Sequence, residues 1–193
     1  MEKAKTTKTR IVNKAIELFQ KEGYENVSVD RICEECGLTK GAFYNYFGRK
    51  IDVLPAFFYM NIVSDENLIV RLFREKDPLE QIWLVFEPTF ELGVKMGAET
   101  MKYSWFYNIE HNNSISSSFM EKPGFGLTNK TTVIELIKNG QETGRLRNDM
   151  SAEDLFQLYY DTQCGISIRW VATGGNFDVI AEMRKALDKT MLT

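Results

Sequence analysis

Cys33 and Cys36 stand three positions apart, which is the spacing of half a zinc site or of a redox-active cysteine pair. A structural zinc ion needs two further ligands, and the rest of the sequence offers only Cys164 and a single histidine, His111. A redox pair of this spacing normally follows a β-strand, and no strand pattern precedes this one. On a short helix both thiols face the buried side, where cysteine behaves as a small apolar residue. We therefore predict no metal site and no cofactor.

Three other patterns could carry chemistry. The segment 124–131, GFGLTNKT, is similar to a phosphate-binding P-loop, but Asn129 stands where that motif needs a glycine. A Ser-His-Asp set would depend on His111, which is more typical of a helix-end or pocket-wall hydrogen-bond partner. Glu87 and Glu91 lie on adjacent helical turns, which indicates either a solvated face or a counter-charge inside a pocket. Because no catalytic set remains, we do not expect an enzyme.

The composition is that of an ordinary soluble globular protein. The chain has 193 residues, of which 44% are apolar and 26% are charged. Its longest apolar runs are too short to span a bilayer, and its first ten residues, MEKAKTTKTR, lack the apolar segment of a secretory signal. Three cysteines, an odd number, favour a reducing compartment over a disulfide framework. We expect a cytoplasmic protein with no membrane partner.

Basic charge is concentrated towards the N-terminus. The first 50 residues hold ten Lys and Arg against seven Asp and Glu, a balance of +3. The remaining residues hold fourteen against twenty, a balance of −6. This split favours a basic end that meets an anionic partner, although a swing of a few charges is also typical of solvated faces.

Apolar residues recur at three- and four-residue spacing along almost the whole chain, which predicts an all-α fold of about nine helices. The first helix ends near Gly23. Ser28 is placed to cap a second helix, and Gly37 to end it in the left-handed conformation. Thr39 can cap a third helix that runs to Phe47. Further helices are expected from residue 50, from residue 77, and over 98–112, 129–142, 151–172 and 176–191.

The second and third helices, with the turn at Gly37 between them, form a helix-turn-helix. Leu38 fills the gap between the two helices, while Phe43 and Phe47, one turn apart, face inward. The outward positions of the third helix combine one cation, one bare backbone and several hydrogen-bonding groups: Thr39, Lys40, Gly41, Tyr44 and Asn45. This combination suits the major groove of DNA, whereas a plain solvated face would show Glu–Lys pairs.

The stretch from Arg10 to Leu54 resembles the DNA-binding domain of the TetR (tetracycline-repressor-like) family. The resemblance lies in AIELFQKEGYENVSVDRICEECGLTKGAFYNYF and the lysine that follows. Two departures are the cysteines 33 and 36, where the family usually has small alanines, and the sequence RKI over 49–51, where it tends to have Ser or Asn and then Lys-Glu. The segments VIELIKNGQETGRLRNDMSAEDL and GISIRWVATGGNFDVIAEMRKAL are similar to the last three helices of that family, while residues 55–125 carry no shared motif.

The resemblance implies a DNA-binding domain over 1–50, with a basic arm over 1–10, and a helical effector-binding and dimerisation domain over 51–193. It further implies an Ω-shaped homodimer that represses transcription from a palindromic operator until a small hydrophobic effector releases it. The alternative is a DNA-binding member that takes no small molecule and acts by recruiting or organising partners. We expect the arm to be mobile without DNA.

Three sets of site residues follow. The expected DNA contacts are Ser28, Thr39, Lys40, Gly41, Tyr44, Asn45, Tyr46, Arg49 and Lys50. Ser28, Tyr46 and Lys50 should hold phosphates, and Arg49 adds a cation beside the DNA backbone. The candidate effector pocket, rich in aromatic and methionine side chains, is Phe58, Trp83, Phe86, Glu87, Phe90, Met101, Trp105, Phe106, Glu110 and His111. The expected dimer interface is Tyr160, Cys164, Val171, Val179, Ile180, Met183 and Leu187.

Overall fold

The computed structural model describes residues 2–62, 66–111 and 130–192, and these residues form ten α-helices and one 3₁₀ helix with no strand. In chain order they are α1 (Glu2–Glu22), α2 (Val29–Cys36), α3 (Lys40–Tyr44), η1 (Lys50–Asp52), α4 (Val53–Ile62), α5 (Glu66–Arg74), α6 (Pro78–Met96), α7 (Ala98–Glu110), α9 (Lys130–Glu142), α10 (Ala152–Ala172) and α11 (Val179–Met191). The predicted all-α class is confirmed. Most of the P-loop-like segment, residues 124–129, lies outside the described residues.

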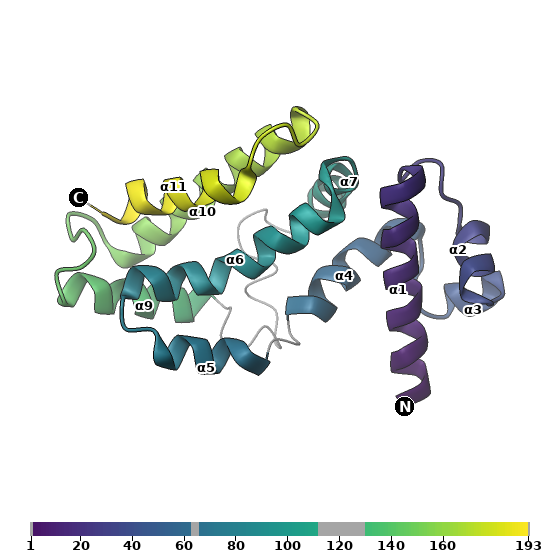
Figure 1. The fold of residues 1–193 in the computed structure, drawn as a ribbon, viewed down its shortest axis with the longest axis horizontal. Helices are drawn as coiled ribbons and strands as arrows, with labels where there is room; N and C mark the ends of the chain where they lie inside the picture. Colours follow the sequence, from purple (N-terminus) through teal and green to yellow (C-terminus); the bar gives the residue numbers. More distant parts are fainter. Residues whose placement is uncertain (1, 63–65, 112–129, 193) are drawn as a thin grey trace.

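The helices form a small N-terminal group and a larger body (Figure 1). Helix α1 stands at one end of the molecule beside α2 and α3, and α4 leads from this group towards the body. Helix α6 runs through the body, with α9 and α11 packed on it and α5 against its first half, while α10 packs on α9 and α11. Within the described ranges, no helix is both long and apolar enough to cross a membrane.

Two hydrophobic clusters hold these groups together. The N-terminal cluster joins α1, α2 and α3 to α4 and to Met96 at the end of α6. The C-terminal cluster joins α5, α6, α9, α10 and α11. Met101 of α7 packs against both clusters. Since the N-terminal cluster includes Val53, Leu54 and Phe57 of α4, packing continues past residue 50, and the division of the chain at that residue stays a prediction.

Local capping explains the helix-turn-helix. Ser28 accepts a hydrogen bond from the Arg31 amide at 3.1 Å, and Thr39 accepts one from the Ala42 amide at 3.2 Å, so both predicted N-caps are present. Gly37 ends α2 at φ +60°, a left-handed conformation that glycine adopts without steric cost. The sequence and the structure therefore agree on the position of the turn.

Three elements differ from the expected ones. Helix α3 ends at Tyr44 rather than Phe47, because the Tyr46 amide donates to the Phe43 carbonyl and tightens the last turn. The stretch between residues 50 and 76 holds two helices, α4 and α5, which accounts for the count of ten. Residues 2–10, the expected mobile arm, continue α1 as helix, and Lys8 Nζ lies 5.6 Å from the centre of the Phe47 ring.

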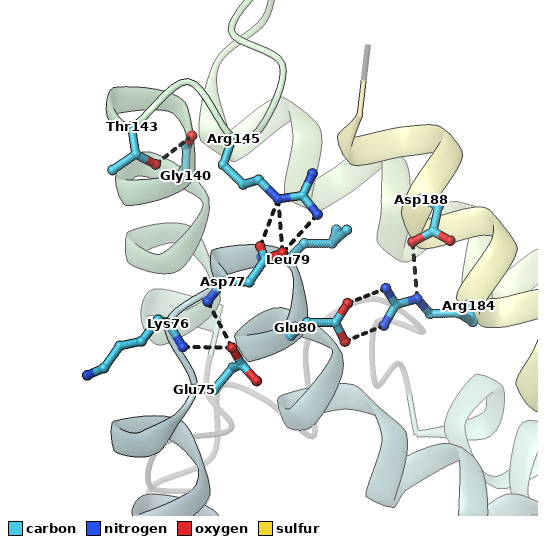
Figure 2. Close-up of polar contacts among 10 residues, drawn as sticks. All are labelled: Glu75, Lys76, Asp77, Leu79, Glu80, Gly140, Thr143, Arg145, Arg184 and Asp188. Atoms are coloured by element: carbon cyan, nitrogen blue, oxygen red, sulfur yellow. Dashed lines mark hydrogen bonds and ion pairs between the residues drawn. The ribbon is translucent and has the colours of Figure 1, made fainter.

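Ion pairs fix the start of α6 to the C-terminal helices (Figure 2). Asp77 caps α6 through the Leu79 amide and also accepts three hydrogen bonds of 2.8–3.0 Å from Arg145. One turn further on, Glu80 accepts two hydrogen bonds from Arg184 of α11, at 2.5 and 2.7 Å. These bidentate pairs orient α6 against both the loop before α10 and α11.

Candidate nucleic-acid interface and effector site

The polar residues of the third helix lie on its exposed face. Every member of the expected major-groove set, Thr39, Lys40, Gly41, Tyr44 and Asn45, is exposed, and the Tyr44 side chain is 52% exposed. Phe43 and Phe47 are buried on the opposite side, with ring centroids 5.5 Å apart. The two buried rings therefore hold a five-residue helix with its polar face outward.

Lys40 and Ser28 remain available to an anion. The Lys40 ammonium pairs with Asp30 at 2.8 Å, but both side chains are more than half exposed, so the pair contributes little and can exchange for a phosphate. Ser28 is exposed and uses its oxygen to accept from the Arg31 amide, which leaves its O–H free to donate. Tyr46, another expected phosphate contact, is half-buried beside the N-terminal cluster.

Lys50 has protein partners where we expected DNA. Its ammonium donates to the carbonyls of Tyr24 and Val27 at 2.7 and 2.8 Å, and it lies 4.1 Å from the centre of the Tyr24 ring. Partial burial lowers the pKa of Lys50. The side chain therefore ties η1 to the loop between α1 and α2, and its assignment to phosphate stays a prediction.

Arg49 connects the helix-turn-helix to α7. Its guanidinium donates to both carboxylate oxygens of Glu110, at 2.9 and 3.1 Å, and Nη2 lies 3.2 Å from His111 Nε2. This pairing lowers the pKa of Glu110. A second link is the stack of Tyr24 on Tyr103, with ring centroids 4.0 Å apart. Two independent contacts thus join the N-terminal group to α7.

The structure brings only some of the candidate effector-pocket residues close together. Trp83, Phe86 and Phe90 of α6 lie in or against the C-terminal cluster with Met101, and the Phe86 ring is 5.3 Å from that of Tyr159. Trp105 reaches α10, where its indole N–H donates to Ser167 at 3.2 Å.

The other candidates are distributed over the molecule, and their assignment to an effector site stays a prediction. Phe58 is part of the N-terminal cluster, and Phe106 is 55% exposed. Glu110 and His111 are exposed at the end of α7, because Arg49 holds them there. Glu87 accepts from the Trp83 indole at 2.9 Å and pairs with Arg71 at 3.6 Å. Each of these acidic side chains therefore already has a polar partner within the protein.

Two polar side chains that were not predicted as site residues lie on α7 and α10. Gln163 of α10 is buried, and its Nε2 has no hydrogen-bond partner within the described part of the chain; the same holds for Asn108 Oδ1 of α7. The sequence feature that could have indicated Gln163 is its spacing: it lies one helical turn from both Tyr159 and Ser167, on the inner face of α10.

The residues of the expected dimer interface fall into two groups, one buried within the single chain and one half-buried. Val179, Met183 and Leu187 are at most 6% exposed in the single chain, because the apolar stripe of α11 packs on its own α10 and α6. They are therefore unavailable to a second subunit, which corrects the prediction. Four others are half-buried: Tyr160, Cys164, Val171 and Ile180. On the outer face of α10, Leu158 and Ile168 are 43% and 49% exposed.

The cysteine pair is part of the core. Cys33 and Cys36 are both buried free thiols, and burial raises the pKa of each. A raised pKa keeps the thiol protonated and unreactive. Among the side chains that the structure describes, no group of three or more His, Cys, Asp or Glu could hold a metal ion.

Comparison with known proteins supports the resemblance. Residues 11–57 match the family described as "Bacterial regulatory proteins, tetR family". The HTH-type transcriptional regulator UidR of Escherichia coli K12 is 34% identical over 82 residues, which cover 42% of this chain and 39% of UidR. The regulator SAB2452 of Staphylococcus aureus is 29% identical over 153 residues, 79% of this chain and 64% of that protein. The chain thus spans less than two thirds of the length of these relatives.

Solved structures share the fold over nearly the whole chain. Thermus thermophilus FadR, a TetR-family repressor in complex with lauroyl-CoA, is 22% identical with a TM-score of 0.64, covering 95% of this chain and 92% of the other. Bacillus subtilis FadR in complex with stearoyl-CoA is 17% identical with a TM-score of 0.59, covering 94% and 96%. At these identities the likeness shows the fold.

Proposed function

Since this chain belongs to the TetR family of transcriptional regulators, we propose that it binds a palindromic operator as a homodimer and is released by a small hydrophobic effector. The observation that carries the proposal is the outward face of α3, where an exposed cation, a glycine and hydrogen-bonding side chains are held by two buried phenylalanines. Lys40, Tyr44 and Asn45 contact base edges or the adjacent phosphates, and Gly41 lets the backbone approach.

Dimerisation uses the outer face of α10. Leu158 and Ile168 leave apolar surface exposed there, and a Cβ on Gly165 would meet nothing within 4 Å in the single chain. A twofold axis at this face pairs the same patch with itself and sets two reading helices at a fixed separation. Palindromic DNA presents its half-sites at a matching separation.

The effector binds among the aromatic and methionine side chains of α6 and α7. Phe86, Phe90 and Met101 pack there against the C-terminal cluster, and two FadR proteins of the same fold are in complex with lauroyl-CoA and stearoyl-CoA. An effector switches the protein only if it binds better to the conformation in which the two helix-turn-helix domains of the dimer are wrongly spaced for DNA. The contacts of Arg49 and Tyr24 with α7 provide the link from the effector site to the DNA-binding domain.

The test is selection of binding sites from random double-stranded DNA by the purified full chain. We expect enrichment of a palindrome, and at least a tenfold loss of affinity, about 1.4 kcal/mol, for Lys40→Met. The matched control is Lys138→Met, which removes the same charge from an exposed, ion-paired lysine of α9. If no sequence is enriched, or if both variants lose affinity equally, the proposal is wrong. A protein that binds the palindrome but responds to no compound in a metabolite screen is a member without an effector.

A further inference from the structure

Helices α7 and α10 lie side by side in opposite directions. The Trp105 indole donates to Ser167 Oγ at 3.2 Å, and towards the other end a Cβ built on Gly175 would lie 3.2 Å from Ala98 Cβ. As residue numbers rise along α7, they therefore fall along α10. One turn beyond the Trp105–Ser167 contact, this register leads to Asn108 on α7 and to Gln163 on α10.

These two residues carry buried polar atoms without partners. Gln163 is 7% exposed, and neither its Nε2 donor nor the Asn108 Oδ1 acceptor has a hydrogen bond in the described ranges of the chain. The hydroxyl of Tyr159 next to Gln163 donates instead to the Met183 carbonyl at 3.4 Å. Burial raises the pKa of Tyr159 and the neighbouring Gln163 side chain opposes that rise, yet Gln163 Nε2 completes no hydrogen bond. Buried polar groups in native proteins nearly always have a partner, so two in one seam indicate a missing one.

Aromatic rings line one side of this seam. Tyr159 packs on Phe86, which stacks on Phe90 with ring centroids 6.2 Å apart. The carboxylate next to Phe86, Glu87, is paired with Arg71, and the carboxylate two residues from Asn108, Glu110, is paired with Arg49. A charged ligand group would enter this seam without a counter-ion and would lose its hydration.

We propose that the seam formed by Gln163 and Asn108 binds the polar end of a neutral, otherwise apolar effector. The carbonyl oxygen of that effector accepts from Gln163 Nε2, and its N–H or O–H donates to Asn108 Oδ1. A carboxamide supplies both groups on one carbon, and the rings of Phe86 and Phe90 receive the apolar part. This inference rests on the proposed effector response and adds to it the chemical class of the ligand.

The experiment uses calorimetry on the full-length protein without DNA. Three probes share one flat ring system and differ in charge: 2-naphthamide is neutral, 2-naphthoate is anionic and 2-naphthylmethylamine is cationic. We expect the amide to bind most tightly. Gln163→Met should weaken amide binding about tenfold, because methionine keeps the volume of the side chain and removes the donor. Gln157→Met, on the exposed face of the same helix, is the matched control and should leave binding unchanged.

Equal binding of the amide by wild type and Gln163→Met would overturn the assignment, as would tighter binding of either charged probe or no binding of the amide. A second readout is thermal stability in the absence of ligand. Removing an unpaired buried donor should leave the melting temperature equal or higher, whereas a fall would show that Gln163 serves Tyr159. Because these measurements contain no DNA, a failure in calorimetry is distinct from a failure to select an operator.

Discussion

Replacement of Lys50 by methionine separates a structural role from a DNA contact. Methionine retains most of the length and apolar volume of the lysine stem but removes the ammonium. The carbonyls of Tyr24 and Val27 then lose donors at 2.7 and 2.8 Å, and the Tyr24 ring loses a cation at 4.1 Å. The loop between α1 and α2, which leads into the helix-turn-helix, would lose its attachment to η1.

The expected cost follows from these contacts. A hydrogen bond to a charged group contributes about 1.5–3 kcal/mol, so two of them give roughly 3–6 kcal/mol before solvent is considered, and the cation–π contact adds about 0.5–1 kcal/mol. The Lys50 side chain is only half-buried, and water can replace part of the loss at both carbonyls. We therefore expect the free energy of unfolding to fall by about 2–3 kcal/mol, which lowers the melting temperature by roughly 4–12 °C for a chain of this size.

The assay is urea unfolding at fixed protein concentration, paired with operator titration at several salt concentrations. Lys40→Met is the reciprocal control: its ammonium pairs with Asp30 at the surface, so stability should stay within about 0.5 kcal/mol while DNA affinity falls. If Lys50→Met is as stable as wild type and flattens the salt slope by about one unit, Lys50 is a phosphate ligand and its structural role is refuted.

Three further changes test other parts of the structure. Gly41→Ala should preserve the melting temperature, since an added Cβ meets nothing closer than 3.9 Å, but should weaken operator binding about fivefold or more by placing a methyl group on the DNA-facing surface; unchanged binding would remove Gly41 from the interface. Arg184 lowers the pKa of Glu80, so this pair stabilises the fold above the ordinary carboxyl range near pH 4.5 and loses that contribution as the pH falls through the lowered pKa. Glu80→Gln should cost about 1 kcal/mol in urea unfolding at pH 7 and much less at pH 3, and an equal cost at both would show that the charge is irrelevant. Ile168→Glu should give monomers in sedimentation at micromolar concentration with the fold intact, and a persistent dimer would place the interface elsewhere.

The helix-turn-helix was predictable because its determinants are local. Ser28 and Thr39 cap helices through amides three residues away, and Gly37 needs only its own backbone conformation. The inward pair Phe43 and Phe47 follows from one-turn spacing. Each of these features could be deduced from a few neighbouring residues in the sequence.

The partners of long side chains were not predictable in this way. Arg49 reaches a carboxylate 61 positions away, and Lys50 reaches carbonyls more than twenty positions back, because the position of η1 beside α7 and the loop between α1 and α2 decides which groups come within reach. The stripe of α11 had two possible partners, its own chain or a second subunit. The spacing of apolar residues indicates that Met183 is buried, but it does not indicate whether its own chain or a second subunit buries it.

Met101 lies where the N-terminal and C-terminal clusters meet and packs against both. A methionine side chain has three rotatable bonds and adapts to altered surroundings at small energetic cost. We expect a compliant residue at this border to let one cluster open while the other stays packed, which gives the chain more than one cooperative unit of unfolding. Native-state hydrogen exchange should therefore resolve two levels of amide protection, one shared by the amides around Phe43 and another by those around Tyr159.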